Sequence, residues 1–469
     1  MLRGPAGLRV RLLRSLVVVV TVGAGLLTTT GAHAAGETQW VRRYNGPLNR
    51  DDAGTAVAVS PDGTTVFVTG WSIGVSASLD YATAAYDAAT GTREWIRRYD
   101  DPAHGTDEAF ALAVSPDGTA VFVTGLASQP GGESYGTVAY AADTGATRWF
   151  RRYMGPAGFS QASAIGVSPD GTTVFVTGFS EGTDREHSDY ATVAYDAATG
   201  TKEWVRRYDV QGEAFALTVS PDGTTVFVTG GSTGSTGSLD YATIAYAADT
   251  GATRWVRRYN SRGDGGDVAR AVAVSPDGST VFVTGGSTFN YLTLAYEAGT
   301  GSTVWHRRYR GTCPCNDQAG QQANAVAVSP DGATVFVSGG SIGSTSTLDY
   351  ATVAYDAGTG ARRWTRRHNG PANGDDVAYS LAVSPDGATV YATGAIAVSI
   401  GGLTAYFTVA YDAATGATGW HRRYEGPGKL DDLAFSLAVS PDGASVFVTG
   451  RAFGTDETSD DFATVAYAA

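Results

Sequence analysis

Short stretches of alternating hydrophobic and polar residues, separated by turn residues, run along the chain from residue 36 to its end. In the first complete unit this pattern predicts four strands, at residues 56–59, 65–69, 81–86 and 95–99. The first two are joined by a Ser-Pro-Asp-Gly turn, in which proline fixes φ and glycine accepts a positive φ. No segment of the sequence shows the period of a helix. The pattern therefore predicts an all-β protein made of four-stranded units.

Two sequence markers each occur eight times and alternate along the chain. The string Val-Ser-Pro-Asp-Gly recurs every 52 to 56 residues, and the segment Trp-x-Arg-Arg interleaves with it one to one. The tryptophans of the second marker are Trp40, Trp95, Trp149, Trp204, Trp255, Trp305, Trp364 and Trp420. A period of this length is typical of propellers and solenoids, in which each small sheet buries its faces against its neighbours.

The two ends of the chain complement each other. The last unit stops at Ala469 with three predicted strands and no tryptophan, whereas residues 36–44 supply one isolated strand that contains Trp40. Joining the end to the start reproduces the text of residues 85–95, one residue shorter. A stack of such sheets must be capped or closed into a circle. We therefore predict an eight-bladed β-propeller with four antiparallel strands per blade, closed by the N-terminal strand.

The first 34 residues have the pattern of a signal peptide. Arginines precede an apolar run from Leu16 to Leu27, and Ala32-His33-Ala34 follows as a small-x-small cleavage site. The alternative is a retained membrane anchor, but glycines and threonines leave the apolar stretch shorter than a membrane span. We predict a signal peptide over residues 1–34, a propeller over residues 35–469, and a secreted protein without a membrane span after cleavage.

Composition narrows the class of partner. The chain has 43% hydrophobic and 17% charged residues, which suits a folded body with a large core. Its formal charge is −13, and removal of the four leader arginines makes it still more negative. Such a chain repels phosphate backbones, so we expect no nucleic-acid partner. Arginine greatly outnumbers lysine, which with the alanine and glycine content indicates a GC-rich bacterium.

A motif in the turn before each tryptophan resembles one known family. The first complete example, A-x-D-x-x-T-G-x-x-x-W, consists of Ala85, Asp87, Thr90, Gly91 and Trp95. Residues 194–204 and 410–420 repeat it, while Ala141, Ala247 and Glu297 replace the aspartate in three other units. The motif resembles the tryptophan-docking motif of eight-bladed quinoprotein propellers, which bind pyrroloquinoline quinone (PQQ). The resemblance implies that each of the eight tryptophans docks on the neighbouring blade. Other phrases are similar to bacterial propeller repeats of unknown ligand.

The resemblance implies a fold more strongly than a chemistry. Quinoprotein alcohol dehydrogenases hold a quinone on the propeller axis with calcium, a catalytic aspartate and an adjacent cysteine pair, and none of these maps onto a residue of this chain. The only cysteines, Cys313 and Cys315, flank Pro314. We interpret them as a small-ring disulfide in an oxidising compartment, with a copper or redox role as the alternative. No cofactor is assigned, and PQQ and calcium stay candidates.

Acidic residues recur at the start of the innermost strands, on the face that carries the variable loops. Nine residues before the repeated proline, five of the eight positions are Asp52, Asp107, Asp267, Asp376 and Asp432. Their carboxylates are candidate ligands for calcium, above all at Asp376 and Asp432, or for a cationic or hydroxyl-rich ligand. The alternative is capping of the strand start. Trp71 is placed in a rim loop, where it stacks on a sugar or packs inward.

Catalytic signatures are weak. The string G-x-S-x-G occurs four times at one position of the repeat, but no predicted helix follows it, so we predict no serine nucleophile. His104 and His187 are too distant in sequence to indicate a metal site. No catalytic residue is assigned. We predict an exported, monomeric propeller that binds an extracellular ligand or protein. The alternative is a propeller enzyme that depends on PQQ or acts on a polysaccharide or lactone.

Overall fold

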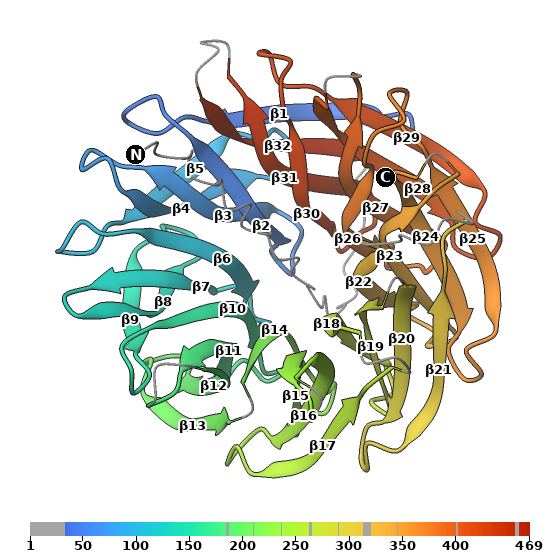
Figure 1. Cartoon of the computed structure of the whole chain (residues 1–469). Coiled ribbons are helices and arrows are strands. Elements are labelled where there is room, and N and C mark those ends of the chain that lie inside the picture. Colours follow the sequence, from blue (N-terminus) through green and yellow to red (C-terminus); the bar gives the residue numbers. More distant parts are fainter. Residues whose placement is uncertain are drawn as a thin grey trace, which may run out of the picture.

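A computed structural model describes residues 33–183, 187–209, 211–235, 237–261, 265–288, 290–312, 320–344, 346–399, 402–454 and 459–469. Within these residues the chain forms 32 β-strands and no helix. The strands make up eight sheets of four antiparallel strands, arranged as blades around a central axis (Figure 1). The predicted eight-bladed β-propeller is confirmed.

Each blade runs from an innermost strand at the axis to an outermost strand at the rim. The innermost strands are β2 (Asp52–Val59), β6 (Asp107–Val114), β10 (Ser160–Val167), β14 (Gly212–Val219), β18 (Asp267–Val274), β22 (Gln322–Val328), β26 (Val377–Val383) and β30 (Leu433–Val439). The second strands are β3 (Thr65–Ile73), β7 (Ala120–Gln129), β11 (Thr173–Glu181), β15 (Thr225–Thr233), β19 (Thr280–Ser287), β23 (Thr334–Ile342), β27 (Thr389–Ala397) and β31 (Ser445–Phe453). The third strands are β4 (Leu79–Asp87), β8 (Gly132–Ala141), β12 (Ser188–Asp196), β16 (Leu239–Ala247), β20 (Asn290–Glu297), β24 (Leu348–Asp356), β28 (Thr404–Asp412) and β32 (Asp460–Ala468). The outermost strands are β5 (Arg93–Tyr99), β9 (Thr147–Tyr153), β13 (Lys202–Tyr208), β17 (Thr253–Tyr259), β21 (Thr303–Tyr309), β25 (Arg362–His368), β29 (Thr418–Tyr424) and β1 (Thr38–Tyr44).

β1 and β32 join the two ends of the chain. β1 pairs antiparallel with β32, with Trp40 opposite Ala466, and the last blade has the order β1-β32-β31-β30 (Figure 1). The pairing continues before the strand begins, because Gly36 N donates to Ala468 O over 2.8 Å. The N-terminal strand therefore completes the eighth blade, as predicted from the sequence.

The repeated tryptophans connect each blade to the next. Trp95 Nε1 donates to Ala142 O of the following blade over 2.8 Å, and the indole ring covers Gly145, where a Cβ atom would lie 2.6 Å away. The same hydrogen bond is made by Trp40, Trp149, Trp204, Trp255, Trp305 and Trp364. Trp420 packs at the seam of the ring, against Gly36. All eight rings are at most 8% exposed, so they bury a large apolar area between blades.

The paired arginines of each Trp-x-Arg-Arg segment also bridge blades. Arg97 Nε donates to Gly145 O of the next blade over 2.9 Å. Arg98 Nη1 donates to Tyr44 OH of the preceding blade over 2.9 Å, and Arg98 Nη2 pairs with Asp80 over 2.7 Å. These arginines therefore belong to the scaffold of the ring.

The strands are longer than the hydrophobic pattern indicates. β2 begins at Asp52 rather than at residue 56, and β3 extends to Ile73 rather than to residue 69. Trp71 therefore lies inside β3, opposite Ala53 on β2 and opposite a tyrosine on β4, and its predicted place in a rim loop was wrong. The prediction stopped early because small and polar residues interrupt the hydrophobic alternation, whereas strand pairing depends on backbone hydrogen bonds.

Two predictions lie outside the described residues. Residues 1–32, which make up most of the predicted signal peptide, are not described, and neither are Cys313 and Cys315 of the predicted disulfide. Both assignments stay predictions. In the described part of the chain, no helix is long and apolar enough to cross a membrane.

Candidate functional site: a ring of bulge residues around the channel

Every innermost strand contains a β-bulge at the same position. The pairing of β2 with β3 shifts between Gly54 and Ala56, so Thr55 is an extra residue without a partner of its own. The same shift occurs in the seven other innermost strands. A bulge bends its strand and re-aims the side chain of the extra residue, and bulges are common next to active sites. Because the innermost strands surround the axis, the eight bulges form a ring around it (Figure 1).

The bulge residues differ from blade to blade, although their neighbours are nearly constant. Glycine or alanine precedes each of them, and alanine or serine follows. The eight bulge residues are Thr55, Phe110, Ser163, Phe215, Arg270, Asn324, Tyr379 and Phe435. They comprise four aromatic side chains, one cation and three small polar groups. In a chain of eight near-copies, this bulge ring is one position close to the axis at which the blades differ in chemistry; the residue two places earlier also varies, for example Ala53, Glu108 and Gln161.

The large bulge residues pack against each other across blade boundaries. Arg270 Cζ lies 4.6 Å from the centre of the Phe215 ring on the preceding blade, within cation–π range. The rings of Tyr379 and Phe435, also on adjacent blades, have centroids 6.0 Å apart. Phe110, Arg270 and Tyr379 are partly exposed. All three lie on innermost strands, which are the strands nearest the axis.

The small polar bulge residues are used by the scaffold. Thr55 Oγ1 donates to Ala109 O of the next innermost strand over 2.9 Å. Asn324 Nδ2 donates in the same way to Ala378 O over 2.8 Å. Both side chains, and that of Ser163, are buried. Phe215 and Phe435 are buried as well, so Phe110, Arg270 and Tyr379 are the members of the bulge ring that offer surface to a ligand.

The chemistry of the exposed members suits recognition. Aromatic faces bind apolar groups, and a guanidinium binds carboxylate or phosphate oxygens in a bidentate way. Burial raises the pKa of Tyr379, and the negative charge of Asp375 raises it further while Arg451 opposes the shift. The Tyr379 hydroxyl is therefore neutral at ordinary pH and can donate or accept a hydrogen bond.

One feature of the sequence marks the bulge position, although the hydrophobic pattern does not. Gly54-Thr55-Ala56 and Ala109-Phe110-Ala111 show it: one variable residue stands between two small ones, at the same place in the repeat. A bulge adds one residue to one strand and so breaks the two-residue alternation. The hydrophobic pattern therefore places this position in the loop before the strand.

The predicted acidic residues are buried at the starts of the innermost strands. All five, Asp52, Asp107, Asp267, Asp376 and Asp432, are 0% exposed. In the last of them, Asp432 Oδ2 accepts a hydrogen bond from Gly426 N over 2.6 Å, and Oδ1 accepts one from Phe453 N over 2.7 Å. The carboxylate thus holds the preceding loop against the end of the second strand. These hydrogen bonds cap the start of the strand, which is the alternative to a ligand site given in the sequence analysis.

Burial also changes the ionisation of these carboxyl groups. Loss of hydration is the largest cause and raises the pKa of Asp107 to about 7, and the pKa values of Asp52, Asp376 and Asp432 to about 6. Hydrogen bonds to the carboxylates oppose this shift in all four cases. The carboxyl groups therefore change charge not far below neutral pH.

Among the described residues, neither Asp376 nor Asp432 belongs to a group of three acidic ligand atoms that lie close together. A calcium ion takes six to eight oxygen ligands. In the part of the chain that is described, the one group of three acidic ligand atoms within 4.8 Å of one another belongs to Asp100, Asp101 and Asp107. The predicted calcium site at Asp376 and Asp432 thus lacks a third acidic ligand among the described residues.

The carboxylates of that three-residue group already have partners. Asp107 Oδ1 accepts from Ser128 N over 2.9 Å, and Asp107 Oδ2 accepts from Asp101 N over 2.8 Å. Asp100 pairs with the exposed His104 over 2.8 Å, and this pairing raises the pKa of His104. The group therefore organises its own loop through local hydrogen bonds.

The repeats match a known family. A family model described as outer membrane protein assembly factor BamB, built on PQQ-type repeats, matches residues 82–323, 134–406 and 241–452. The chain belongs to this family. The overlapping matches cover most of the propeller, in agreement with the resemblance to PQQ-type repeats. A comparison with curated proteins found no match.

Several solved propellers are similar in fold. Sqt1 of Chaetomium thermophilum, bound to the N-terminus of the ribosomal protein L10, has a TM-score of 0.62 at 14% identity, covering 92% of this chain and 100% of that one. The C-terminal WD40 domain of Sif2 has a TM-score of 0.59 at 11% identity, covering 92% and 100%. The quinohemoprotein alcohol dehydrogenase of Comamonas testosteroni has a TM-score of 0.57 at 14% identity, covering 92% and 76%. At these identities the similarity concerns the fold alone.

The residues beside the channel do not fit PQQ. This cofactor is a flat tricarboxylate, so a site for it needs several cationic or hydrogen-bond-donating groups around one plane. The bulge ring supplies one cation, Arg270, and its guanidinium already lies against Phe215. Asn324 is occupied with a backbone carbonyl. The described part of the channel therefore gives no basis for a quinone-dependent step.

Proposed function

We propose that this chain is an exported bacterial binding propeller that holds a ligand or protein segment at the variable-loop end of its channel, without chemistry of its own. The observation that carries the proposal is the bulge ring: it holds different side chains in otherwise near-identical blades, and Phe110, Arg270 and Tyr379 are accessible. A scaffold alone needs no such variation at positions flanked by small, nearly constant residues. Variation there serves to distinguish one ligand from another.

The family and the fold support this function from a second direction. The description of the family model names an outer membrane protein assembly factor, which is in accord with an exported protein. Sqt1, whose fold is similar, was solved with the N-terminus of a ribosomal protein bound. A protein segment is thus a ligand that a propeller of this size accommodates, and it suits a site with aromatic faces and one guanidinium.

A ligand array with matched variants tests the proposal. The mature chain, residues 35–469, is screened against peptide and glycan arrays, and each hit is measured by calorimetry. The Phe110→Ala, Tyr379→Ala variant should weaken binding of a genuine ligand at least tenfold, and Arg270→Ala should weaken binding of acidic ligands most. Val304→Ala, which removes a half-exposed apolar side chain from the outermost strand β21, is the control and should leave binding within twofold.

Two results would overturn the proposal. In the first, ligands bind the mature chain but the bulge-ring variants and the control behave alike, which would place the site elsewhere. In the second, the purified protein acquires a bound quinone spectrum on mixing with PQQ and calcium and oxidises alcohols with an electron-accepting dye, which would make it an enzyme. Export is tested separately, by detecting the mature N-terminus in the culture medium or cell envelope of the producing bacterium.

A further inference from the structure

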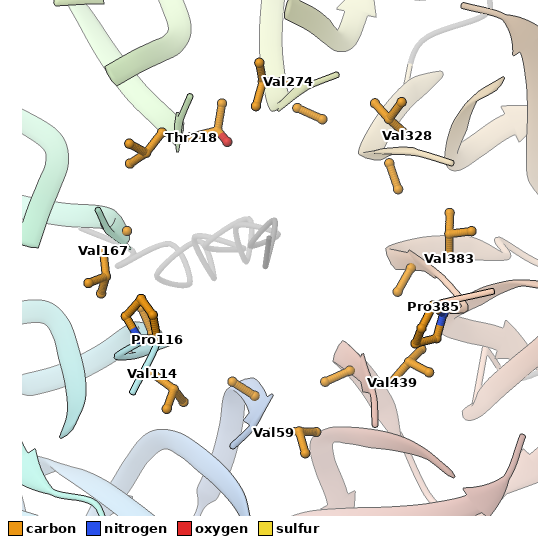
Figure 2. Close-up of a pocket in the computed structure, with 18 of the residues that line it drawn as sticks. Val59, Val114, Pro116, Val167, Thr218, Val274, Val328, Val383, Pro385 and Val439 are labelled. Carbon is orange, nitrogen blue, oxygen red and sulfur yellow. The ribbon is translucent and has the colours of Figure 1, made fainter. Parts of the chain in front are cut away.

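The channel contains an apolar cavity at the end opposite the variable loops. The cavity has a volume of about 500 Å³ and lies where the innermost strands end in their Ser-Pro-Asp-Gly turns. Figure 2 shows its wall, formed by the last residue of each innermost strand and by the prolines that follow. The last residue is valine in all eight strands, for example Val167 and Val383. This size is within the range of pockets that bind small ligands or side chains.

The eight turns form a closed collar around the mouth of this cavity. In each turn the glycine packs on the proline of the preceding blade: a Cβ atom on Gly118 would lie 3.4 Å from Pro61 Cδ, and one on Gly63 would lie 3.5 Å from Pro441 Cδ. The same contact recurs at the six other turns. The second of these contacts joins the first blade to the last, so the collar has no gap. It is thus a fixed ring that needs no rearrangement to receive a ligand.

Each turn of the collar carries one exposed aspartate. The eight are Asp62, Asp117, Asp170, Asp222, Asp277, Asp331, Asp386 and Asp442. Their carboxylates are held in one orientation: Asp117 Oδ1, for instance, accepts from Ser115 Oγ over 2.5 Å and from Thr119 N over 3.0 Å. Hydrogen bonding by the serine hydroxyl is the largest cause that lowers the pKa of Asp117, and the same holds at five other turns.

The collar aspartates have arginines in their vicinity but no ion-pair partners among the described residues. None of the ion pairs among the described residues involves a collar aspartate. The nearby arginines belong to outermost strands: after the hydrogen bonds, the positive charges of Arg148, Arg254 and Arg363 also lower the pKa values of Asp117, Asp222 and Asp331. These arginines donate their hydrogen bonds elsewhere, to Thr119 O, Thr225 Oγ1 and Thr334 Oγ1. The mouth of the cavity therefore combines an apolar wall with a ring of eight fixed negative charges.

We propose that this collar is a second binding surface, and that its ligand is a basic protein segment that inserts an apolar side chain into the cavity. The apolar wall requires an apolar group, and the aspartates around it require positive charge on both sides of that group. A second copy of this chain would bring two rings of eight carboxylates together, so self-association through the collar is disfavoured. The surface lies on the face opposite the bulge ring and goes beyond the function proposed above.

A defined peptide and two charge-matched variants test this inference. The probe is fluorescein-labelled Arg-Leu-Arg-Phe-Arg-Leu-Arg, and binding to the mature chain is followed by fluorescence anisotropy at 50 mM and 300 mM salt. The collar variant replaces Asp117, Asp222, Asp331 and Asp442 with asparagine, which keeps the oxygen that accepts the serine hydrogen bond. The control variant replaces Asp87, Asp196, Asp356 and Asp412 with asparagine, in the turns of the same face that precede the outermost strands.

Each variant and each probe has its own expected result. The collar variant should bind the probe at least tenfold more weakly than the parent and lose most of the salt dependence, while the control variant should stay within twofold. A probe with glycine in place of leucine and phenylalanine should bind the parent at least tenfold more weakly. If the collar variant fails to fold, Val383→Trp is the second test. It fills the cavity and leaves all charges in place, and it should abolish binding.

Three outcomes would overturn the inference. Equal weakening by the collar and control variants would show only a general attraction of the acidic protein for a basic peptide. Equal binding of the glycine probe would remove the role of the apolar cavity. Sedimentation of the parent as a dimer that the collar variant dissociates would assign the surface to a second copy. The Phe110→Ala, Tyr379→Ala variant should bind the probe like the parent, which separates this test from that of the bulge ring.

Discussion

Replacing Asp432 with asparagine should remove part of the pH dependence of stability. The Asp432 carboxyl group is 0% exposed and accepts hydrogen bonds from Gly426 N and Phe453 N. Loss of hydration raises its pKa from 3.8 to about 6, despite these two hydrogen bonds. The folded protein therefore binds this proton more tightly than the unfolded chain does. Unfolding releases the proton between pH 4 and pH 6, so this group makes the fold less stable as the pH rises.

The size of the effect follows from the shift. A difference of about two pKa units corresponds to about 3 kcal/mol between a fully protonated and a fully ionised Asp432. Part of this loss of stability has already occurred at pH 4.5, because the carboxyl group in the unfolded chain titrates near pH 3.8. Linkage leaves about 2 kcal/mol for the interval from pH 4.5 to pH 8. Asparagine does not titrate, so the parent should lose about 2 kcal/mol more than the variant across this interval.

Urea unfolding of both proteins at pH 4.5, 6 and 8 measures this difference. The variant also loses the stabilisation of a hydrogen bond, but this loss is the same at every pH. It therefore cancels when the change of the unfolding free energy with pH is compared, rather than its absolute value. Asp386→Asn is the control: hydrogen bonding by Ser384 and Ala388 lowers the pKa of Asp386, so its titration lies below the interval. That variant should keep the slope of the parent. If Asp432→Asn also keeps it within about 0.5 kcal/mol, the carboxyl group is hydrated and the reasoning from burial is refuted.

Three further predictions concern the scaffold. Trp204→Ala, which removes a 6% exposed indole and its hydrogen bond to Ala248 O, should cost about 3–5 kcal/mol in urea unfolding, and a cost below about 1 kcal/mol would contradict its role between blades. Deleting residues 35–44 should expose the edge of β32 and lower the melting temperature, with association visible by sedimentation; a monomer that melts like the parent would show that closure by β1 adds nothing. Gly450→Ala should destabilise by about 1–3 kcal/mol, because its Cβ would lie 1.9 Å from Leu433 O, whereas Gly299→Ala, with nothing within 4 Å, should fall within about 0.5 kcal/mol of the parent.

The number of blades and the closure of the ring could be predicted from the sequence because both are properties of the repeat. Counting the Trp-x-Arg-Arg segments and the proline turns gives eight, and the outermost strand that the last unit lacks is present at residues 36–44. Neither inference depends on where a strand begins or ends. The structure confirms both, with Trp40 opposite Ala466 in the last blade.

The bulge ring could not be predicted in the same way, because a bulge is defined by the pairing of two strands. Thr55 and Phe110 occupy one slot of the repeat, but nothing in the residues themselves says that Gly54 and Ala56 pair with consecutive residues of β3. Aligning the eight units marks the slot as variable, and only the register shows that it is part of a strand at the axis. The variable position and its location are thus separate pieces of information.

The acidic pattern at the strand starts has a structural cause that extends to the blades without an aspartate. Ser160 Oγ accepts a hydrogen bond from Gly155 N over 2.9 Å, and Gln321 Oε1 accepts one from Gly311 N over 2.8 Å, as Asp432 Oδ2 does from Gly426 N.

Gly212 has no side chain to do this, and there the loop is shorter: three residues separate β13 from β14, whereas seven separate β5 from β6. The position therefore requires a hydrogen-bond acceptor for a long loop, and aspartate is one of three residues that supply it. The same hydrogen bond to a loop amide therefore accounts for aspartate, serine and glutamine at this position, without a ligand.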